Sequence, residues 1–227
     1  MDKDIEKKAH HLEVINSFAV QLLECKDEDS VLWLITKHAI AKLGYLDCVV
    51  YLADRSKKIL IQKAAHGPKN PIDFDINNPI TLKFGEGICG NVAISGKAQL
   101  TSDTNQEPNY RIDDKKRSSE ITVPIINAKN EVIGIIDSEH PDLNFYKTMD
   151  LEMLTTIASM SSSKLHSIWY ENKLNHHKSE LEEKVTLQTK ELKLYIEELE
   201  RKNDELIVQE KEKAILLQDI HNRVKNN

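Results

Sequence analysis

The sequence predicts an α+β domain followed by one long helix. Four segments with the alternating apolar pattern of strands, among them residues 48–53 and 132–139, lie between stretches with helical spacing. No glycine or proline follows Pro141, so the rest of the 227-residue chain lacks the usual helix breakers. Strands that are preceded and followed by helices are typical of an antiparallel sheet covered by helices.

Two helices are expected ahead of the sheet. In the first, apolar residues recur at steps of three and four up to Leu22, and the stripe ends near the charged residues 26–29. Asp29 or Ser30 is expected to be the N-cap of the second helix, which Gly44 closes.

The middle of the chain changes to the two-residue period of strands. Two hairpins are expected, the first from residues 48–53 and 59–65 and the second from residues 120–126 and 132–139. Between them, the polar, proline-bearing stretch 67–79 is too long for a simple turn and is a candidate pocket lid. Residues 88–95 fit a short helix that follows a glycine-rich turn.

From Asp150 onward the pattern is helical to the end of the chain. Heptad position a is apolar apart from one lysine: Val185, Leu192, Leu199, Leu206, Lys213 and Ile220. Position d is half polar: Leu181, Gln188, Tyr195, Lys202, Gln209 and Leu216. A helix of this length would not be stable alone, so its apolar stripe is expected to meet a second copy, as a parallel dimeric coiled coil, or the first helix. A seam with polar d positions is compatible with a helix pair that shifts during signalling.

Composition argues against several classes of protein. The formal net charge of -6 and the pI near 5.9 leave no basic surface for nucleic acid. No run of about 18 apolar residues could span a membrane, and the polar start of the chain does not resemble a signal peptide. Three cysteines far apart, Cys25, Cys48 and Cys89, suit reduced thiols, so a cytoplasmic location is expected.

No metal site is expected. The adjacent pairs 10–11 and 176–177 lie on helices, where neighbouring side chains point in different directions.

Two spaced blocks resemble the GAF domain pattern. The first covers residues 84–93 (FGEGICGNVA) with 95–97, and the second covers residues 119–125 (SEITVPI) with 132–138 (VIGIIDS). The resemblance spans about residues 28–168. It implies a GAF-type antiparallel six-stranded sheet, with helices on one face and a small-molecule pocket on the other.

Polar residues on the second predicted hairpin are candidates for that pocket. Alternation puts Glu120 and Thr122 on one face of their strand, and Asp137 and Glu139 on one face of the next. If these carboxylates enter a pocket, repulsion should raise the pKa of at least one, or a cation must lie among them. The alternative is that they face solvent. The candidate ligand-binding residues are Cys89, Tyr110, Glu120, Thr122, Asp137 and Glu139.

The end of the chain, residues 216–227 (LLQDIHNRVKNN), is similar to the phospho-acceptor box of bacterial sensor histidine kinases with an H-x-R-V-K-N-N signature. The resemblance implies that His221 accepts the γ-phosphoryl group of ATP. Asp219 could orient its ring, and Arg223 and Lys225 would complement phosphate charge. With residue 220 at heptad position a, His221 falls at b, outside the seam.

Together these resemblances predict the sensory part of a two-component histidine kinase. The expected divisions are an N-terminal amphipathic helix at 1–27, a GAF sensor domain at 28–168, a coiled-coil signalling helix at 169–213 and the start of the phospho-acceptor domain at 214–227. The sequence contains no glycine-rich nucleotide motif, so ATP and Mg²⁺ would bind in a kinase domain outside this chain, which alone should be inactive. The expected partners are a second copy, bound through the N- and C-terminal helices, a response regulator and an unidentified small molecule.

Two other functions stay open. The chain could be a dimeric GAF and coiled-coil scaffold without a ligand. It could also be an enzyme like the free methionine-sulfoxide reductases. The chain resembles these GAF domains in its glycine-cysteine block and in the acids at 120, 137 and 139. In that family the nucleophile would fall seven residues before Glu120, where this chain has Asp113. Cys89 alone cannot complete a cycle that needs a nucleophilic and a resolving thiol.

Overall fold

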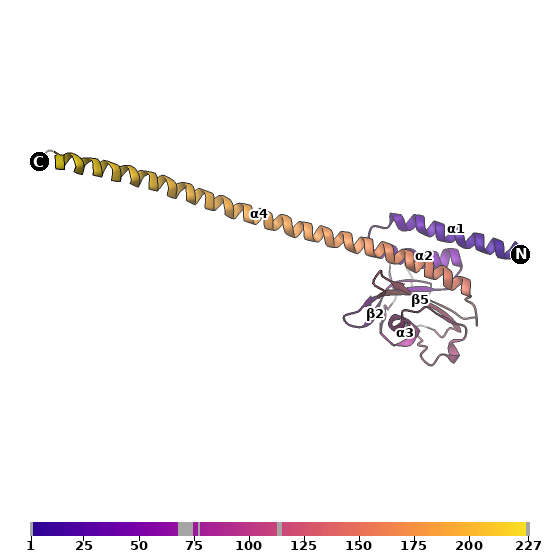
Figure 1. Ribbon diagram of the computed structural model, residues 1–227. Helices are drawn as coiled ribbons and strands as arrows, with labels where there is room; N and C mark the ends of the chain where they lie inside the picture. Colours follow the sequence, from indigo (N-terminus) through magenta and orange to yellow (C-terminus); the bar gives the residue numbers. More distant parts are fainter. Residues whose placement is uncertain (1, 68–74, 77, 113–114, 226–227) are drawn as a thin grey trace. The chain divides into compact units, whose positions relative to one another are not determined.

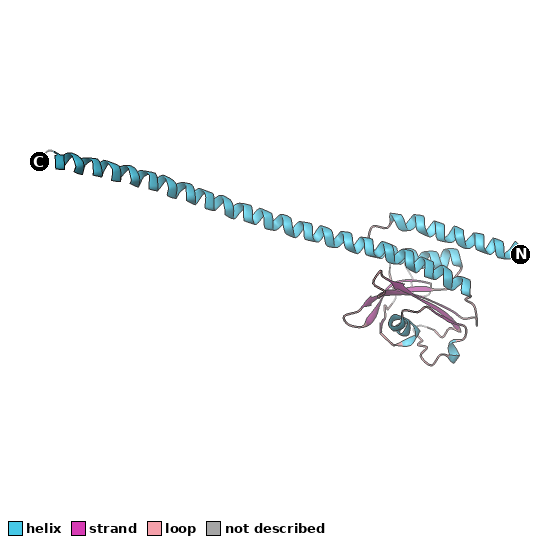
Figure 2. Ribbon diagram, viewed as in Figure 1, coloured by secondary structure: helices cyan, strands magenta, loops and turns pink. Residues whose placement is uncertain are grey.

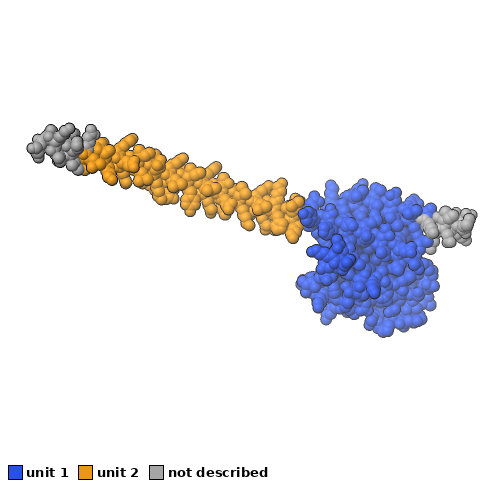
Figure 3. Space-filling model, in the orientation of Figure 1, with its two compact units in different colours: residues 1–171 blue, residues 172–227 orange. Residues whose placement is uncertain are grey.

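The computed structural model describes residues 2–67, 75–76, 78–112 and 115–225, with the backbone alone at 2–8, 39–41 and 218–225. The chain divides into two compact units, residues 1–171 and 172–227 (Figure 3). Most of the candidate lid at 67–79 lies outside the described residues, so its role stays a prediction.

The first unit is built on a six-stranded antiparallel sheet, as the resemblance implied (Figure 2). Its strands are β1 (Cys48–Asp54), β2 (Ile59–His66), β3 (Thr81–Lys83), β4 (Gln99–Thr101), β5 (Ser119–Ile126) and β6 (Val132–His140), in the order β3-β2-β1-β6-β5-β4. The four strands expected from alternation are present. The two edge strands, β3 and β4, escaped notice because three residues carry too little pattern.

Helices cover both faces of this sheet. The helices α1 (Asp2–Glu24) and α2 (Glu28–Leu43) and the first part of α4 (Thr148–Lys225) lie on one face, and α3 (Gly87–Ser95) lies on the other (Figure 1). Fully buried side chains from these helices, such as Phe18, Ile35 and Leu154, pack with Ile136 of the sheet in the larger core. A smaller core between the sheet and α3 surrounds Tyr51 and contains the pocket described below.

The second helix begins earlier than the sequence analysis expected. The backbone N–H of Ser30 donates to Oδ1 of Asp27 at 2.8 Å, and the N–H of Asp27 donates back to Oγ of Ser30 at 3.3 Å. This reciprocal arrangement makes Asp27 the cap, so the expectation of Asp29 or Ser30 was wrong. The expected end is confirmed, because Gly44 follows the last residue of α2 with a φ of 69°.

Three side-chain hydrogen bonds attach the first part of α4 to the rest of the first unit, one of them from Nζ of Lys164 to the carbonyl oxygen of Leu23 at 3.1 Å. Ser162 donates to the carbonyl oxygen of Ile126 at 2.7 Å, at the end of β5. Trp169 Nε1 donates to Oε2 of Glu28 at 2.8 Å, at the start of α2. The buried residues Leu165 and Ile168 lie between these attachments. Displacements of the sheet can therefore reach α4 directly.

The second unit is helical throughout its described residues and exposes its apolar side chains. The apolar residues at the proposed seam are 58–64% exposed: Leu181, Val185, Leu192, Leu199, Leu206 and Leu216. Within the described part of the chain, no helix is both long and apolar enough to cross a membrane.

Candidate ligand pocket

A small cavity lies between the sheet and α3. Its volume is about 30 Å³, room for about two water molecules. Ile80, Leu82 and Ile88 supply apolar walls, and the polar lining consists of Tyr51, Cys89, Arg111, Glu120, Asp137 and Glu139. Of the six residues expected to bind a ligand, four line this cavity: Cys89, Glu120, Asp137 and Glu139. A fifth, Thr122, contacts two of these acids.

The three carboxylates come from the pairing of β5 with β6. Glu120 lies opposite Glu139, and Thr122 lies opposite Asp137. All three acids are buried, with only 4–7% of their surface exposed. The alternative that they face solvent is therefore wrong.

The surroundings of Glu120 favour the protonated form of its carboxyl group. Burial, followed by repulsion from Asp137 and Glu139, raises its pKa well above the ordinary value. The hydroxyl of Thr122 lies 2.9 Å from Oε1 of Glu120 and 2.8 Å from Oδ1 of Asp137. A hydroxyl carries one proton, so both contacts are hydrogen bonds only if one carboxyl group donates. The geometry and the pKa shift agree on one carboxyl proton at the site.

The glycine-rich motif presents Cys89 to this cluster. The N–H of Gly85 donates to the carbonyl oxygen of Gly90 at 2.9 Å, which folds the segment before α3 against the helix. Burial, and then the nearby Asp137 and Glu120, raises the pKa of the Cys89 thiol. A thiol with a raised pKa is a poor nucleophile.

Replacing Gly90 by alanine should destabilise the domain by about 3 kcal/mol or more. An added Cβ would lie 2.5 Å from the carbonyl oxygen of Lys83 and 2.9 Å from the amide nitrogen of Gly85, and neither backbone atom can give way easily. Urea unfolding measures the loss. The matched control is Gly44→Ala, where nothing lies within 4 Å and only the positive φ costs about 1 kcal/mol. Equal losses in the two variants would contradict this reading.

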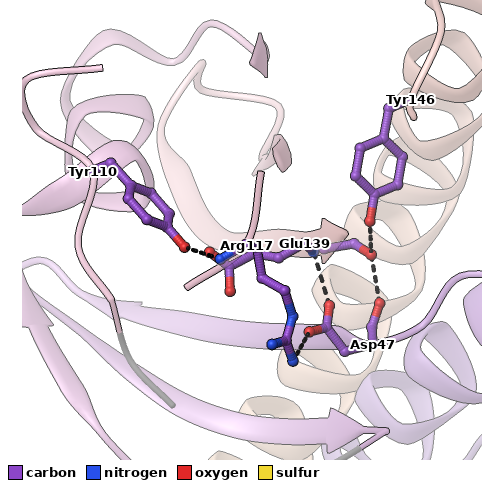
Figure 4. Close-up of polar contacts among 6 residues, drawn as sticks. Asp47, Tyr110, Arg117, Glu139 and Tyr146 are labelled. Carbon is purple, nitrogen blue, oxygen red and sulfur yellow. Dashed lines mark hydrogen bonds and ion pairs between the residues drawn. The ribbon is translucent and has the colours of Figure 1, made fainter. Parts of the chain in front are cut away.

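Tyr110, the sixth candidate, lies beside the cavity instead of in its wall. Its hydroxyl accepts the backbone N–H of Arg117 at 3.0 Å. The guanidinium of Arg117 is buried and its Nη2 lies 3.6 Å from Oδ2 of Asp47 (Figure 4). The other oxygen of Asp47, Oδ1, accepts the N–H of Glu139 at 2.8 Å. The pairing of Asp47 with Arg117 was not predicted from the sequence, because nothing in the local pattern of either residue marks a buried ion pair.

The strand β6 connects the pocket with the start of α4. Asp137 and Glu139 face the cavity, whereas Ser138 between them faces the helices. The hydroxyl of Ser138 donates to the carbonyl oxygen of Asp47 and lies 2.7 Å from the hydroxyl of Tyr146 (Figure 4). Tyr146 is fully buried two residues before α4 begins. A change at the carboxylates can therefore be passed through one strand to this helix.

The candidate phosphorylation residues cannot be placed in the same way. The backbone of α4 includes Asp219, His221, Arg223 and Lys225, but their side chains lie outside the described part of the structure. Asp113 also lies outside it. Their roles stay predictions.

The fold and this pocket agree with the family comparison, in which the model named GAF domain matches residues 25–163. The chain therefore belongs to the GAF domain family.

Among curated proteins, the chain is similar to the free methionine-R-sulfoxide reductase of Saccharomyces cerevisiae, with 33% identity over 79 residues, 35% of this chain and 44% of that protein. The chain covers less than half the length of the curated relatives it matches.

Solved structures share the fold. One is the free methionine-R-sulfoxide reductase of Neisseria meningitidis in complex with its substrate, with a TM-score of 0.65, 20% identity and coverage of 73% of this chain and 93% of that chain. Another is a putative GAF sensor protein from Burkholderia vietnamiensis, with a TM-score of 0.61, 18% identity and coverage of 70% and 98%.

Proposed function

We propose that this chain is the sensory and signal-transmitting part of a two-component sensor histidine kinase. Its GAF domain binds a small molecule and controls phosphorylation of His221. The observation that carries the sensing role is the buried pocket with three carboxylates. The phospho-acceptor role is supported by the H-N-R-V-K-N-N motif at residues 221–227. In this reaction a neutral imidazole nitrogen forms a bond to the γ-phosphorus of ATP, and ADP leaves from a kinase domain.

The charge of the pocket favours a ligand with an ammonium or amine group. Glu120, Asp137 and Glu139 share one proton and so leave the cavity with negative charge, and the one arginine in its lining, Arg111, pairs with Glu86. A cavity of about 30 Å³ accepts such a group but not a whole amino acid. Binding of an amino-acid-like ligand would therefore move the cavity wall, which is the change a sensor requires.

Reductase chemistry is less well supported than ligand binding. The chain is similar to a reductase over 79 residues, but Cys89 has a raised pKa. The other two cysteines, Cys25 and Cys48, belong to the core on the opposite face of the sheet. A ligand-free scaffold is also less well supported, because burying three acids is costly without a binding role.

Transmission would run from β6 to α4. A ligand that contacts Asp137 or Glu139 would shift the strand, and Ser138 would carry the shift to Tyr146. A ligand that prefers one signalling state a hundredfold biases the equilibrium by about 2.7 kcal/mol. This is enough to change the register or rotation of a weak helix pair.

The proposed unit of signalling is a homodimer. The exposed seam residues of α4 would be covered by the same residues of a second copy. On α1, Leu12, Val20 and Leu23 are 55–78% exposed, which supports a second contact through the N-terminal helix. Response regulator binding would follow phosphorylation at His221.

Replacing Lys202 and Lys213 by leucine should tighten the dimer at least tenfold, because both lysines occupy seam positions. Sedimentation equilibrium measures the dissociation constant. Lys190 and Lys211 fall at heptad position f, so replacing both by leucine is the matched control and should leave dimerisation unchanged. In the full-length kinase the tightened seam should also abolish the response to ligand. Equal effects of the two pairs of substitutions would contradict the proposed seam.

Thermal denaturation across a library of amines and amino acids tests the sensing function. A compound at about a hundred times its Kd should raise the Tm by about 5 °C or more. Glu139→Gln keeps the shape of the cavity wall but removes a charge, so it should weaken the binding of that compound about tenfold. The control is Glu131→Gln, an exposed acid on the same domain. A library without any stabilising compound would count against ligand sensing.

A further inference from the structure

One thiol and two carboxylates converge in the cavity wall. Sγ of Cys89 and carboxylate oxygens of Glu120 and Asp137 all lie within 4.8 Å of one another, and all three side chains are buried. They come from α3, β5 and β6, so the packing of three elements holds them together. We propose that these three side chains form a binding site for a zinc ion.

A fourth side chain in the same cavity points to a bound group. Tyr51 is 98% buried, since only 2% of its surface is exposed, and it lines the cavity. Its phenol lies close enough to Cys89 and Asp137 for their charges to act on it, so it belongs to the same cluster. A buried hydroxyl nearly always takes a hydrogen-bond partner, which in a cavity can be a water molecule. The hydroxyl of Tyr51 is placed to bind a water molecule or ligand atom held by the ion.

The Cys89 thiol favours a metal ion over the other groups that could neutralise the negative charge of these acids. Protons or an ammonium group could neutralise Glu120 and Asp137, but neither gains much from a sulfur atom. Zinc takes both thiolate and carboxylate ligands, at about 2.3 and 2.1 Å respectively. Around one tetrahedral ion such atoms are about 3.5 Å apart, so the cluster would need to contract by little more than about 1 Å. Harder ions such as Mg²⁺ prefer six oxygen ligands, which this cluster does not supply.

Three protein ligands leave one position of a tetrahedral ion open. This position would face the cavity, where a ligand with an amine or carboxylate donor could reach it. The role of the ion in ligand recognition rests on the proposed sensing function. The binding of the ion itself does not. The prediction of no metal was argued from the histidines of the chain, and the present cluster contains no histidine.

Metal titration of the chain tests the site. After treatment with a chelator, the protein should bind one Zn²⁺ per chain in competition with a chromophoric chelator. Co²⁺ in the same site should give the intense near-ultraviolet absorption of a cobalt–thiolate bond. Cys89→Ser should abolish this absorption and weaken Zn²⁺ binding about a hundredfold, and Asp137→Asn should weaken it at least tenfold. Mg²⁺ in large excess should not compete.

The control is Cys25→Ser, which removes a partly exposed thiol on the other side of the sheet and should leave binding unchanged. The proposal is overturned if the parent binds no stoichiometric Zn²⁺, if Cys89→Ser keeps the cobalt–thiolate absorption, or if replacing His176 and His177 removes the binding instead. If Cys89→Ser does not fold, the Zn²⁺ affinity of Glu120→Gln and of Asp137→Asn tests the site instead. Zn²⁺ affinity unchanged in both variants would overturn the proposal. These measurements need neither an organic ligand nor a kinase domain, so their outcome is independent of the sensing and phosphorylation tests.

Discussion

Under the proposed function, phosphorylation by labelled ATP should be lost completely when His221 is replaced by alanine in the full-length protein. The motif at residues 221–227 implies that this imidazole receives the γ-phosphoryl group, and alanine has no nucleophilic nitrogen. The measurement is the acid-labile label on the protein after incubation with labelled ATP.

His177 provides the matched control for this loss. It is another histidine of α4, exposed and paired with Glu180. His177→Ala should be labelled like the parent protein. Label that persists in His221→Ala would mean that the motif does not mark the phospho-acceptor, and would leave a GAF domain of unknown output.

Asp47→Ala should lower the free energy of unfolding by about 3–5 kcal/mol. The carboxylate of Asp47 pairs with the buried guanidinium of Arg117 and accepts the N–H of Glu139. Its removal takes away a buried counter-charge of the Arg117 guanidinium. Urea denaturation, with the slope checked for two-state behaviour, gives the difference.

An exposed ion pair on the same domain shows what burial contributes. Arg55 lies 3.9 Å from Glu131, and both side chains are more than 40% exposed. Arg55→Ala should therefore change stability by less than about 1 kcal/mol. A loss below about 1 kcal/mol for Asp47→Ala as well would show that the buried pair does not hold β6 in place.

The sheet was largely predictable because its long strands show clear alternation. The same alternation placed Glu120, Asp137 and Glu139 on one face, and the structure brings them together. The three-residue strands β3 and β4 were not predictable, since their pairing depends on neighbouring strands. The start of α2 was misjudged although the Asp27-x-x-Ser30 spacing was visible, because the apolar stripe was given more weight.

The polar surroundings of the pocket could not be read from local pattern. Tyr51 enters the cavity from β1, and Arg117 reaches Asp47 from a segment without regular structure. Such contacts join residues far apart in the chain, so only the assembled fold reveals them. The cluster of Cys89 with Glu120 and Asp137 escaped attention for the same reason.

The central claim is that the state of the GAF pocket controls His221. The most direct test is the initial rate of His221 phosphorylation in the full-length protein, with and without a compound that raises the Tm of the GAF domain. The account predicts that the compound changes this rate severalfold in the parent and has little effect in Glu139→Gln at the same concentration. A rate that the compound leaves unchanged in the parent, while it still binds the domain, would contradict the account.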